Sequence, residues 1–324
     1  MRKVAPQSSA LLERYSSARA ERIGRLSSRA KESLAYQKEA VLTALYIADI
    51  SRESLQVWVP ADGTPISFLA GLPSARLRED QMVMNDLTKI PGFDLVSEGV
   101  HITGQAVFQS DTERLTVVLA NRLPLEEQTG TDLIYFNETF QSFVMVQYKA
   151  MKREDDGDGN KNVGFRLPNT QLTKEIARME MLLAALKACP VNVDRHGFRL
   201  IENPFFLKLC PRIDFNPDDI GLVPGMYLPL GYWKLLEQDP GIRGPRGGRR
   251  ITYENVSRHF DNTTFASMVA VGTTPNQSSV LKDAIRQTLE TGKAVAIAVK
   301  PKKEDLRPPR SESESGEKIE GLIE

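Results

Sequence analysis

The most informative pattern of apolar and polar positions in the chain lies at residues 130–149. An apolar run, a short polar segment and a second apolar run follow one another there, which is typical of a β-hairpin. Asp132 opens the first expected strand, and Gln147 and Lys149 lie in the second. Because strand side chains alternate in direction, Gln147 and Lys149 are expected on one face of the hairpin and Tyr148 on the other.

Further patterns flank this hairpin on both sides. Residues 75–89 predict a helix and residues 115–121 a β-strand. Residues 172–188 carry apolar residues at helical spacing, and residues 205–210 predict a short strand between prolines. The order helix, strand, hairpin, helix, strand predicts an α/β fold with a mixed central sheet.

The remaining segments divide the chain into four regions. Residues 9–49 favour one long helix or a helical pair, since they contain no proline and a single glycine. We assign an N-terminal helical region to 1–54, the α/β core to 55–215 and a C-terminal α/β extension to 216–300. The tail at 301–324 has almost no apolar content and is predicted to be disordered. The N-terminal helices fit a cap on the core and also fit a docking or oligomerisation arm.

Three elements are expected in the C-terminal extension. A helix is predicted to start near Tyr232, a second helix covers 278–290, and a strand follows at 294–299. These elements fit an accessory lobe, and they equally fit an extension of the same sheet.

Charge is balanced over the chain as a whole. Lys plus Arg and Asp plus Glu number 42 each, so no overall positive field attracts nucleic acid, and such binding depends on local patches. The strongest patch is the glycine-rich segment 241–250, which can follow a phosphate backbone or form a mobile surface loop whose charges face water. Its arginines are Arg243, Arg246, Arg249 and Arg250.

Composition otherwise describes an ordinary globular protein. Apolar residues make up 41% and charged residues 26% of the chain, enough to bury a full core. The two cysteines, Cys189 and Cys210, suit a reducing cytosol and are too few for a disulfide scaffold or a Cys-based zinc site. No apolar run approaches the roughly 18 residues that span a bilayer, and no signal peptide is recognisable. We therefore expect a cytoplasmic protein that does not associate with a membrane.

Gln147 and Lys149 place an amide and an ammonium on an otherwise apolar strand. Burying these groups costs free energy unless both find partners. A site that holds a divalent cation, a phosphate and a water supplies such partners, with Asp132 and the Gln147 amide oxygen as hard ligands and Lys149 facing the anion. An amphipathic strand whose lysine reaches solvent at a sheet edge explains the same pattern.

This pattern resembles the PD-(D/E)xK nuclease superfamily in the variant in which Gln replaces the second acid, as in Mrr-like restriction enzymes and many defence-associated nucleases. Asp132 matches the metal-binding Asp of that family, Gln147 its second ligand position and Lys149 its catalytic Lys. The superfamily core runs helix, three strands, helix, strand. The resemblance therefore implies a restriction-endonuclease-like αβββαβ core, and the agreement of the flanking elements carries more weight than three short motif positions.

The resemblance also implies a reaction, the hydrolysis of a phosphodiester bond by metal-assisted attack of water. Mg²⁺ or Mn²⁺ would be held by Asp132, by the Gln147 side-chain oxygen, by the Tyr148 carbonyl, and by Glu127 directly or through water. Lys149 would orient or help deprotonate the water and offset charge on the phosphorane. Because Gln removes one negative charge relative to Glu, weaker metal binding and a preference for Mn²⁺ are expected.

Other catalytic sites have no support in the sequence. His101, His196 and His259 lie far apart, which gives no local support to a zinc cluster or a histidine-based catalytic pair. No GxxxxGK[ST] phosphate loop is present. The acidic segment 154–160 is not an EF-hand calcium loop, because counting from Asp155 or Asp156 there is no glycine at the sixth position and no glutamate at the twelfth. We interpret it as a polar loop.

The expected function is a metal-dependent nuclease, with DNA favoured over RNA and a role in prokaryotic anti-phage defence implied by the resemblance. The alternative is a catalytically inactive module that keeps the nuclease fold and binds nucleic acid or a partner protein. A hydrolase of small nucleotides is a third possibility. A homo-oligomer or a separate partner protein fits each of these functions.

Overall fold

The computed structural model describes the chain at residues 16–60, 67–72, 101–121, 132–140, 142–155, 161–188, 198, 200–243, 247–270 and 295–301. Several of the predictions above fall outside these residues. They are the helices at 75–89 and 278–290, Glu127, Cys189, His196, Arg246 and the disordered tail.

The described strands form one mixed sheet. In chain order they are β1 (His101–Gln109), β2 (Arg114–Asn121), β3 (Asp132–Asn137), β4 (Ser142–Asp155), β5 (Lys161–Leu167), β6 (Phe205–Pro211), β7 (Met226–Pro229), β8 (Arg249–Thr252) and β9 (Val295–Lys300). The main path runs β1-β2-β9-β3-β4-β5-β8, and β6 joins it beside β4, followed by β7. β3 and β4 form an antiparallel hairpin, whereas β3–β9 and β4–β6 are parallel pairs. The α/β class and the mixed central sheet are therefore confirmed.

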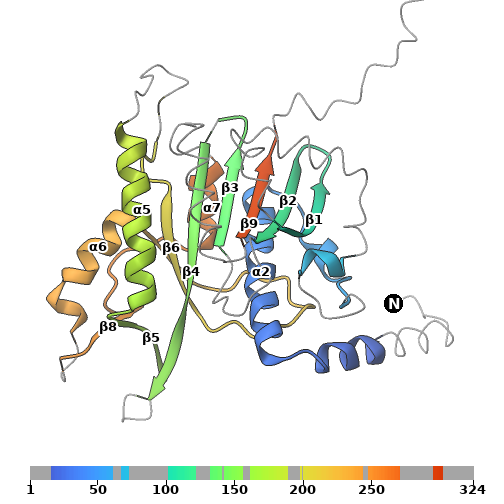
Figure 1. Ribbon diagram of the computed structural model, residues 1–324, viewed down its shortest axis with the longest axis horizontal. Helices are drawn as coiled ribbons and strands as arrows, with labels where there is room; N and C mark the ends of the chain where they lie inside the picture. Colours follow the sequence, from blue (N-terminus) through green and yellow to red (C-terminus); the bar gives the residue numbers. More distant parts are fainter. Residues whose placement is uncertain are drawn as a thin grey trace, which may run out of the picture.

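Helices cover both faces of this sheet (Figure 1). They are α2 (Ser28–Ile47), α5 (Thr170–Ala188), α6 (Leu230–Gln238) and α7 (Asn262–Ala270). Side chains of α2 and α7 share one hydrophobic cluster with one face of the strands, and side chains of α5 and α6 share a second cluster with the other face. We call these two sides of the sheet the α2 face and the α5 face.

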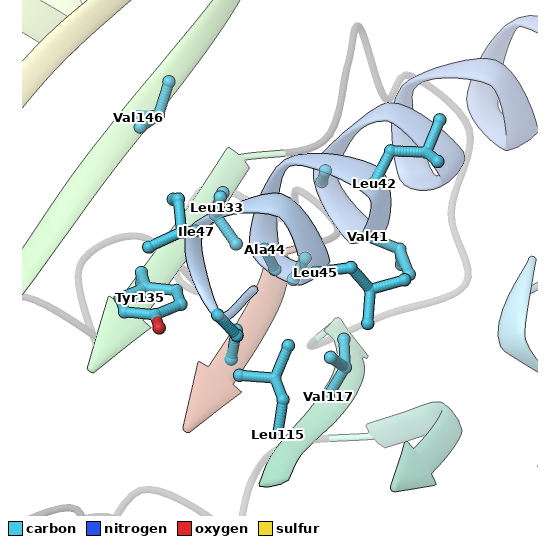
Figure 2. Close-up of a cluster of buried hydrophobic side chains, with 14 of the residues drawn as sticks. Val41, Leu42, Ala44, Leu45, Ile47, Leu115, Val117, Leu133, Tyr135 and Val146 are labelled. Atoms are coloured by element: carbon cyan, nitrogen blue, oxygen red, sulfur yellow. The ribbon is translucent and has the colours of Figure 1, made fainter. Parts of the chain in front are cut away.

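The N-terminal region is a helical pair. Residues 16–24 are helical, the helix then breaks, and Ser27 caps α2 by accepting a hydrogen bond from the Ala30 amide at 3.2 Å. Figure 2 shows how α2 lies on the sheet, with Val41 and Leu45 pointing toward side chains of β2 and β3. All of these α2 side chains are buried. This helix is therefore part of the core, as expected of a cap.

The hairpin and its neighbours match their predicted positions. β3, β4, α5 and β6 cover the predicted segments, because each carries a long run with a single hydrophobic period. β4 is longer than expected and continues through Asp155, where its outer half pairs with β5 rather than β3. The predicted strand at 294–299 is β9, which lies between β2 and β3 in the central sheet.

The end of the arginine-rich segment, Arg249 and Arg250, lies in a strand where a flexible loop was predicted. Arg249 and Arg250 begin β8, which pairs with β5 in antiparallel register. Ile251 of this strand is fully buried, so its packing holds the neighbouring arginines in extended backbone. The interpretation as a mobile loop is wrong for these residues.

Candidate functional site

Gln147 and Lys149 are buried on the α5 face of β4. Their relative exposures are 5% and 8%. Met145 and Met151, which share their direction by strand alternation, belong to the hydrophobic cluster that includes α5. The alternative in which Lys149 reaches solvent at a sheet edge is therefore wrong. The strand β4 lies between β3 and β6, and the helix α5 covers the face on which Lys149 lies.

Backbone register places position 132 beside Gln147. Leu133 of β3 pairs with Val146 of β4 in an antiparallel ladder, so the preceding residue of β3 lies opposite the following residue of β4. Asp132 also pairs in parallel with Val295 of β9, and Val295 belongs to the cluster on the α5 face. Positions 132, 147 and 149 therefore share one face of the sheet, although the Asp132 side chain lies outside the described part of the structure.

Lys149 forms a buried ion pair with a residue that was not predicted as part of the site. Its Nζ lies 2.5 Å from Oε2 of Glu175 on α5, and the two side chains are 9% and 4% exposed. Oε1 of Glu175 accepts a hydrogen bond from Gln171 Nε2 one helical turn earlier, at 3.0 Å. Glu175 on α5 therefore holds the Lys149 ammonium in place, and Gln171 holds the Glu175 carboxylate.

A sequence signal for Glu175 does exist. The apolar stripe of α5 includes Leu172, Ile176 and Met179, and position 175 falls within that stripe at helical spacing. A carboxylate on the buried stripe of a helix needs a cationic partner. The buried lysine predicted on the neighbouring strand is such a partner, so the pair could have been inferred.

The Gln147 amide remains unsatisfied beside this ion pair. Its Nε2 is buried and has no hydrogen-bond partner in the described part of the structure. An orphaned amide group costs about 1 to 3 kcal/mol in a folded protein. Because Nε2 is a donor, a hydrogen-bond acceptor that faces it, such as a water or a phosphate oxygen, would remove that cost.

Oxygen ligands for a divalent cation are available at this position. Gln147 supplies an amide oxygen, and the register of β3 and β4 places the aspartate position 132 opposite it. Such hard oxygen ligands suit Mg²⁺ and Mn²⁺. No three His, Cys, Asp or Glu side chains gather into a metal site within the described residues, among which the Asp132 side chain is not included.

Tyr148 points away from the site, onto the α2 face. Its ring is 1% exposed. Burial, followed by the nearby Tyr227 and Glu39, raises the pKa of the Tyr148 hydroxyl well above its ordinary value. The phenol therefore takes no part in chemistry on the α5 face, and only the Tyr148 carbonyl is available for the metal role inferred from the resemblance.

A second buried lysine lies on the opposite face of the sheet. Lys208 of β6 forms an ion pair with Glu39 of α2, and the two side chains are 0% and 1% exposed. The other Glu39 oxygen accepts a hydrogen bond from the Val223 amide at 3.1 Å. Lys208 Nζ also lies 5.5 and 4.9 Å from the ring centroids of Tyr148 and Tyr227. This second pair is closed on all sides by protein and joins α2 to the sheet.

The side chains of two of the predicted nucleic-acid arginines, Arg249 and Arg250, contact other parts of the protein. Arg249 Nη1 donates to the Glu237 carbonyl at 2.8 Å. The Arg250 side chain crosses Gly164 so closely that a Cβ on this glycine would lie 2.0 Å from Arg250 Nε. Arg243 is exposed, and its backbone bridges to Arg249. Arg249 and Arg250 thus lie on the edge strand β8 and Arg243 pairs beside it, with β5 between β8 and β4.

The other polar groups singled out in the sequence are not part of the site. Burial raises the pKa of the Cys210 thiol to about 12, which leaves it protonated and unreactive at neutral pH. His259 makes a ring contact with Tyr253. No helix within the described residues is long and apolar enough to cross a membrane.

No family profile, curated protein or solved structure matches the chain.

Proposed function

We propose that the protein is a metal-dependent nuclease with a restriction-endonuclease-like core, whose site is built from Asp132, Gln147 and Lys149. The observation that carries the proposal is the unsatisfied Gln147 amide next to the buried Lys149–Glu175 pair. The backbone register that puts position 132 opposite Gln147 supports it further. Lys149 is already paired with Glu175, so the Nε2 atom of Gln147 is the buried polar group of these positions that a ligand would satisfy.

The order of elements also supports the proposal. β3 and β4 form the expected antiparallel hairpin, α5 crosses over, and β6 returns parallel to β4. Apart from β5, which lies between β4 and α5 in the chain, this order matches the later part of the αβββαβ core. The first strand of that order is replaced beside β3 by β9, which comes from the C-terminal region. The proposed core therefore departs from the family pattern on the side of β3 that is remote from Lys149.

The roles of the side chains follow from their charges and positions. A metal ion held by Asp132, Gln147 and Glu127, with the Tyr148 carbonyl, would supply Lewis acidity at the scissile phosphate. Lys149 presents a cation beside this position and stabilises negative charge that develops on the phosphate oxygens. Glu175 acts as a positioning residue, since it holds the Lys149 ammonium in place.

Cleavage assays with substituted proteins test the proposal. The substrates are plasmid DNA, single-stranded DNA and RNA, each with Mg²⁺ or Mn²⁺. Asp132→Asn and Lys149→Met are expected to lower the rate by about 10²-fold or more, the range for losing one electrostatic contact in such a site. Lys152→Met, an exposed lysine of the same strand, is the matched control and is expected to cleave normally.

The outcomes separate two errors. Wild-type protein that cleaves none of the substrates with either metal would refute the nuclease function. Cleavage that survives Asp132→Asn in folded protein would instead refute the assignment of the site.

A second candidate function is a non-catalytic module that binds nucleic acid. It is favoured by the Lys149–Glu175 pair, in which the lysine is already neutralised by a protein carboxylate. Retardation of DNA in a gel at moderate salt, without cleavage in either metal, would support this function. In that case Lys149→Met would weaken folding without changing DNA affinity in the folded fraction.

A further inference from the structure

The two sides of α5 differ in what they contact. Glu180 forms an ion pair with Lys234 of α6, so α6 covers one side of the helix. Gln171, Lys174 and Arg178 are three or four residues apart, which places them together on the opposite side. In Figure 1, α6 and the strands β4 and β3 lie on opposite sides of α5. We call Gln171, Lys174 and Arg178 the basic flank of α5.

This basic flank borders the proposed site directly. Gln171 donates its hydrogen bond to Glu175, and Glu175 pairs with Lys149. Lys174 is the chain neighbour of Glu175, and Arg178 lies one turn further along the helix. A polymer that reaches Lys149 from this side therefore passes along Lys174 and Arg178.

The two cations of the basic flank, Lys174 and Arg178, differ from Lys149, Lys208 and Lys234 in that they are not paired with a carboxylate of the described residues. Lys149, Lys208 and Lys234 are each paired with a carboxylate. Lys174 is exposed and Arg178 half-buried, and neither forms an ion pair or side-chain hydrogen bond within the described residues. These two charges are therefore available to an external anion.

We propose that the basic flank of α5 binds the phosphate backbone of the nucleic acid and guides it to Lys149. This inference rests on the proposed nuclease function. Lys174 and Arg178 are separated by about 6 Å along the helix, and their long side chains can each reach a different phosphate. Arg249 is committed to the Glu237 carbonyl and Arg250 to the surface of Gly164, so the α5 flank offers freer cations close to the site.

Salt-dependent DNA binding tests this inference. The full-length chain carrying Asp132→Asn, which prevents cleavage, is titrated onto fluorescein-labelled duplex DNA, and anisotropy is measured between about 50 and 200 mM salt. Lys174→Gln/Arg178→Gln is compared with the control Lys152→Gln/Lys187→Gln. Both substituted pairs remove two positive charges, and the control lysines are exposed at other positions.

Loss of two phosphate contacts has a defined signature. The slope of log K against log salt is expected to decrease by about 2 in the flank variant and to stay unchanged in the control. At about 100 mM salt the flank variant is expected to bind at least tenfold more weakly. Thermal unfolding of each variant establishes that the fold is kept.

Two results would overturn the inference in distinguishable ways. Equal slopes in the flank variant and in the parent, with DNA still bound, would reject the basic flank and leave the nuclease proposal standing. Equal weakening in the flank variant and in the control would show a non-specific charge effect and would also reject it. A parent protein that binds no DNA, together with a wild type that cleaves none, would remove the proposed function and this inference together.

Discussion

Replacing Gln147 by methionine should stabilise the protein while removing its function. Methionine is unbranched and about as long as glutamine, so it can fill the space on the α5 face without a cavity. The substitution removes a buried amide whose Nε2 has no partner in the described part of the structure. The expected effect is the opposite of that of most core substitutions, which destabilise.

The magnitude follows from the cost of an orphaned amide. Such a group costs about 1 to 3 kcal/mol, and part of this cost is regained when an apolar side chain of similar shape replaces it. We expect a gain of about 1 kcal/mol in the free energy of unfolding. Because 1 kcal/mol shifts Tm by about 2 to 4 °C in domains of 150 to 250 residues, a rise of at least about 2 °C is expected.

Gln37 provides a matched control for this measurement. It is a buried glutamine at 2% exposure, but its amide is satisfied at both ends. Oε1 accepts from the Phe68 amide at 2.8 Å, and Nε2 donates to Ser33 Oγ at 3.2 Å. Gln37→Met leaves the Phe68 amide unpaired and is expected to lower stability by about 1 to 3 kcal/mol.

The assay is thermal unfolding of wild type and both variants, with DNA cleavage measured on the same preparations. Gln147→Met is expected to raise Tm and lose cleavage, and Gln37→Met to lower Tm and keep cleavage when folded. If Gln147→Met lowers Tm as much as Gln37→Met does, the Gln147 amide is part of the structural network. The reasoning that places a ligand beside it would then be wrong.

Three further predictions concern the α2 face. Lys208→Met should lower the free energy of urea unfolding by about 3 to 5 kcal/mol, because it leaves the Glu39 carboxylate buried without its partner. The double variant Lys208→Met/Glu39→Leu should regain much of this stability. Stability should fall above about pH 10. Burial lowers the pKa of Lys208, but Glu39, Tyr227 and Cys210 together raise it above its ordinary value, and burial raises the pKa of Tyr227, so both groups lose protons on unfolding. A flat urea midpoint between pH 9 and 11 would contradict this. Gly225→Ala should destabilise, since its Cβ would lie 2.9 Å from a backbone carbonyl oxygen, whereas Gly231→Ala meets open space and should be neutral or stabilising by thermal unfolding.

Local elements with one strong hydrophobic period could be predicted from the sequence. The hairpin, α5 and β6 each combine a clear period with turn residues at the ends, and the polar positions 147 and 149 are visible within such a run. The sharing of a face by positions 147 and 149 follows from strand alternation, whereas position 132 joins them through the β3–β4 register seen in the structure. These predictions needed no information from distant parts of the chain.

Non-local pairing could not be predicted in this way. β9 lies between β2 and β3, far from both in sequence, and nothing in its own residues specifies those neighbours. β5 and β8 are short strands whose polar residues hide their period, so the arginines of β8 were interpreted as a loop. Their strand conformation depends on packing of Ile251 and Phe165 against α6 and its surroundings.

Two buried lysine–glutamate pairs lie on opposite faces of the neighbouring strands β4 and β6. On the α2 face, Lys208 and Glu39 are enclosed by protein groups, including the Val223 amide, and that pair is complete. On the α5 face, Lys149 and Glu175 lie beside an amide without a partner. If both pairs served only to attach helices to the sheet, an apolar residue at position 147 would raise stability without a loss of activity. We therefore propose the α5 face as the place of the site, and Gln147→Met distinguishes the two cases.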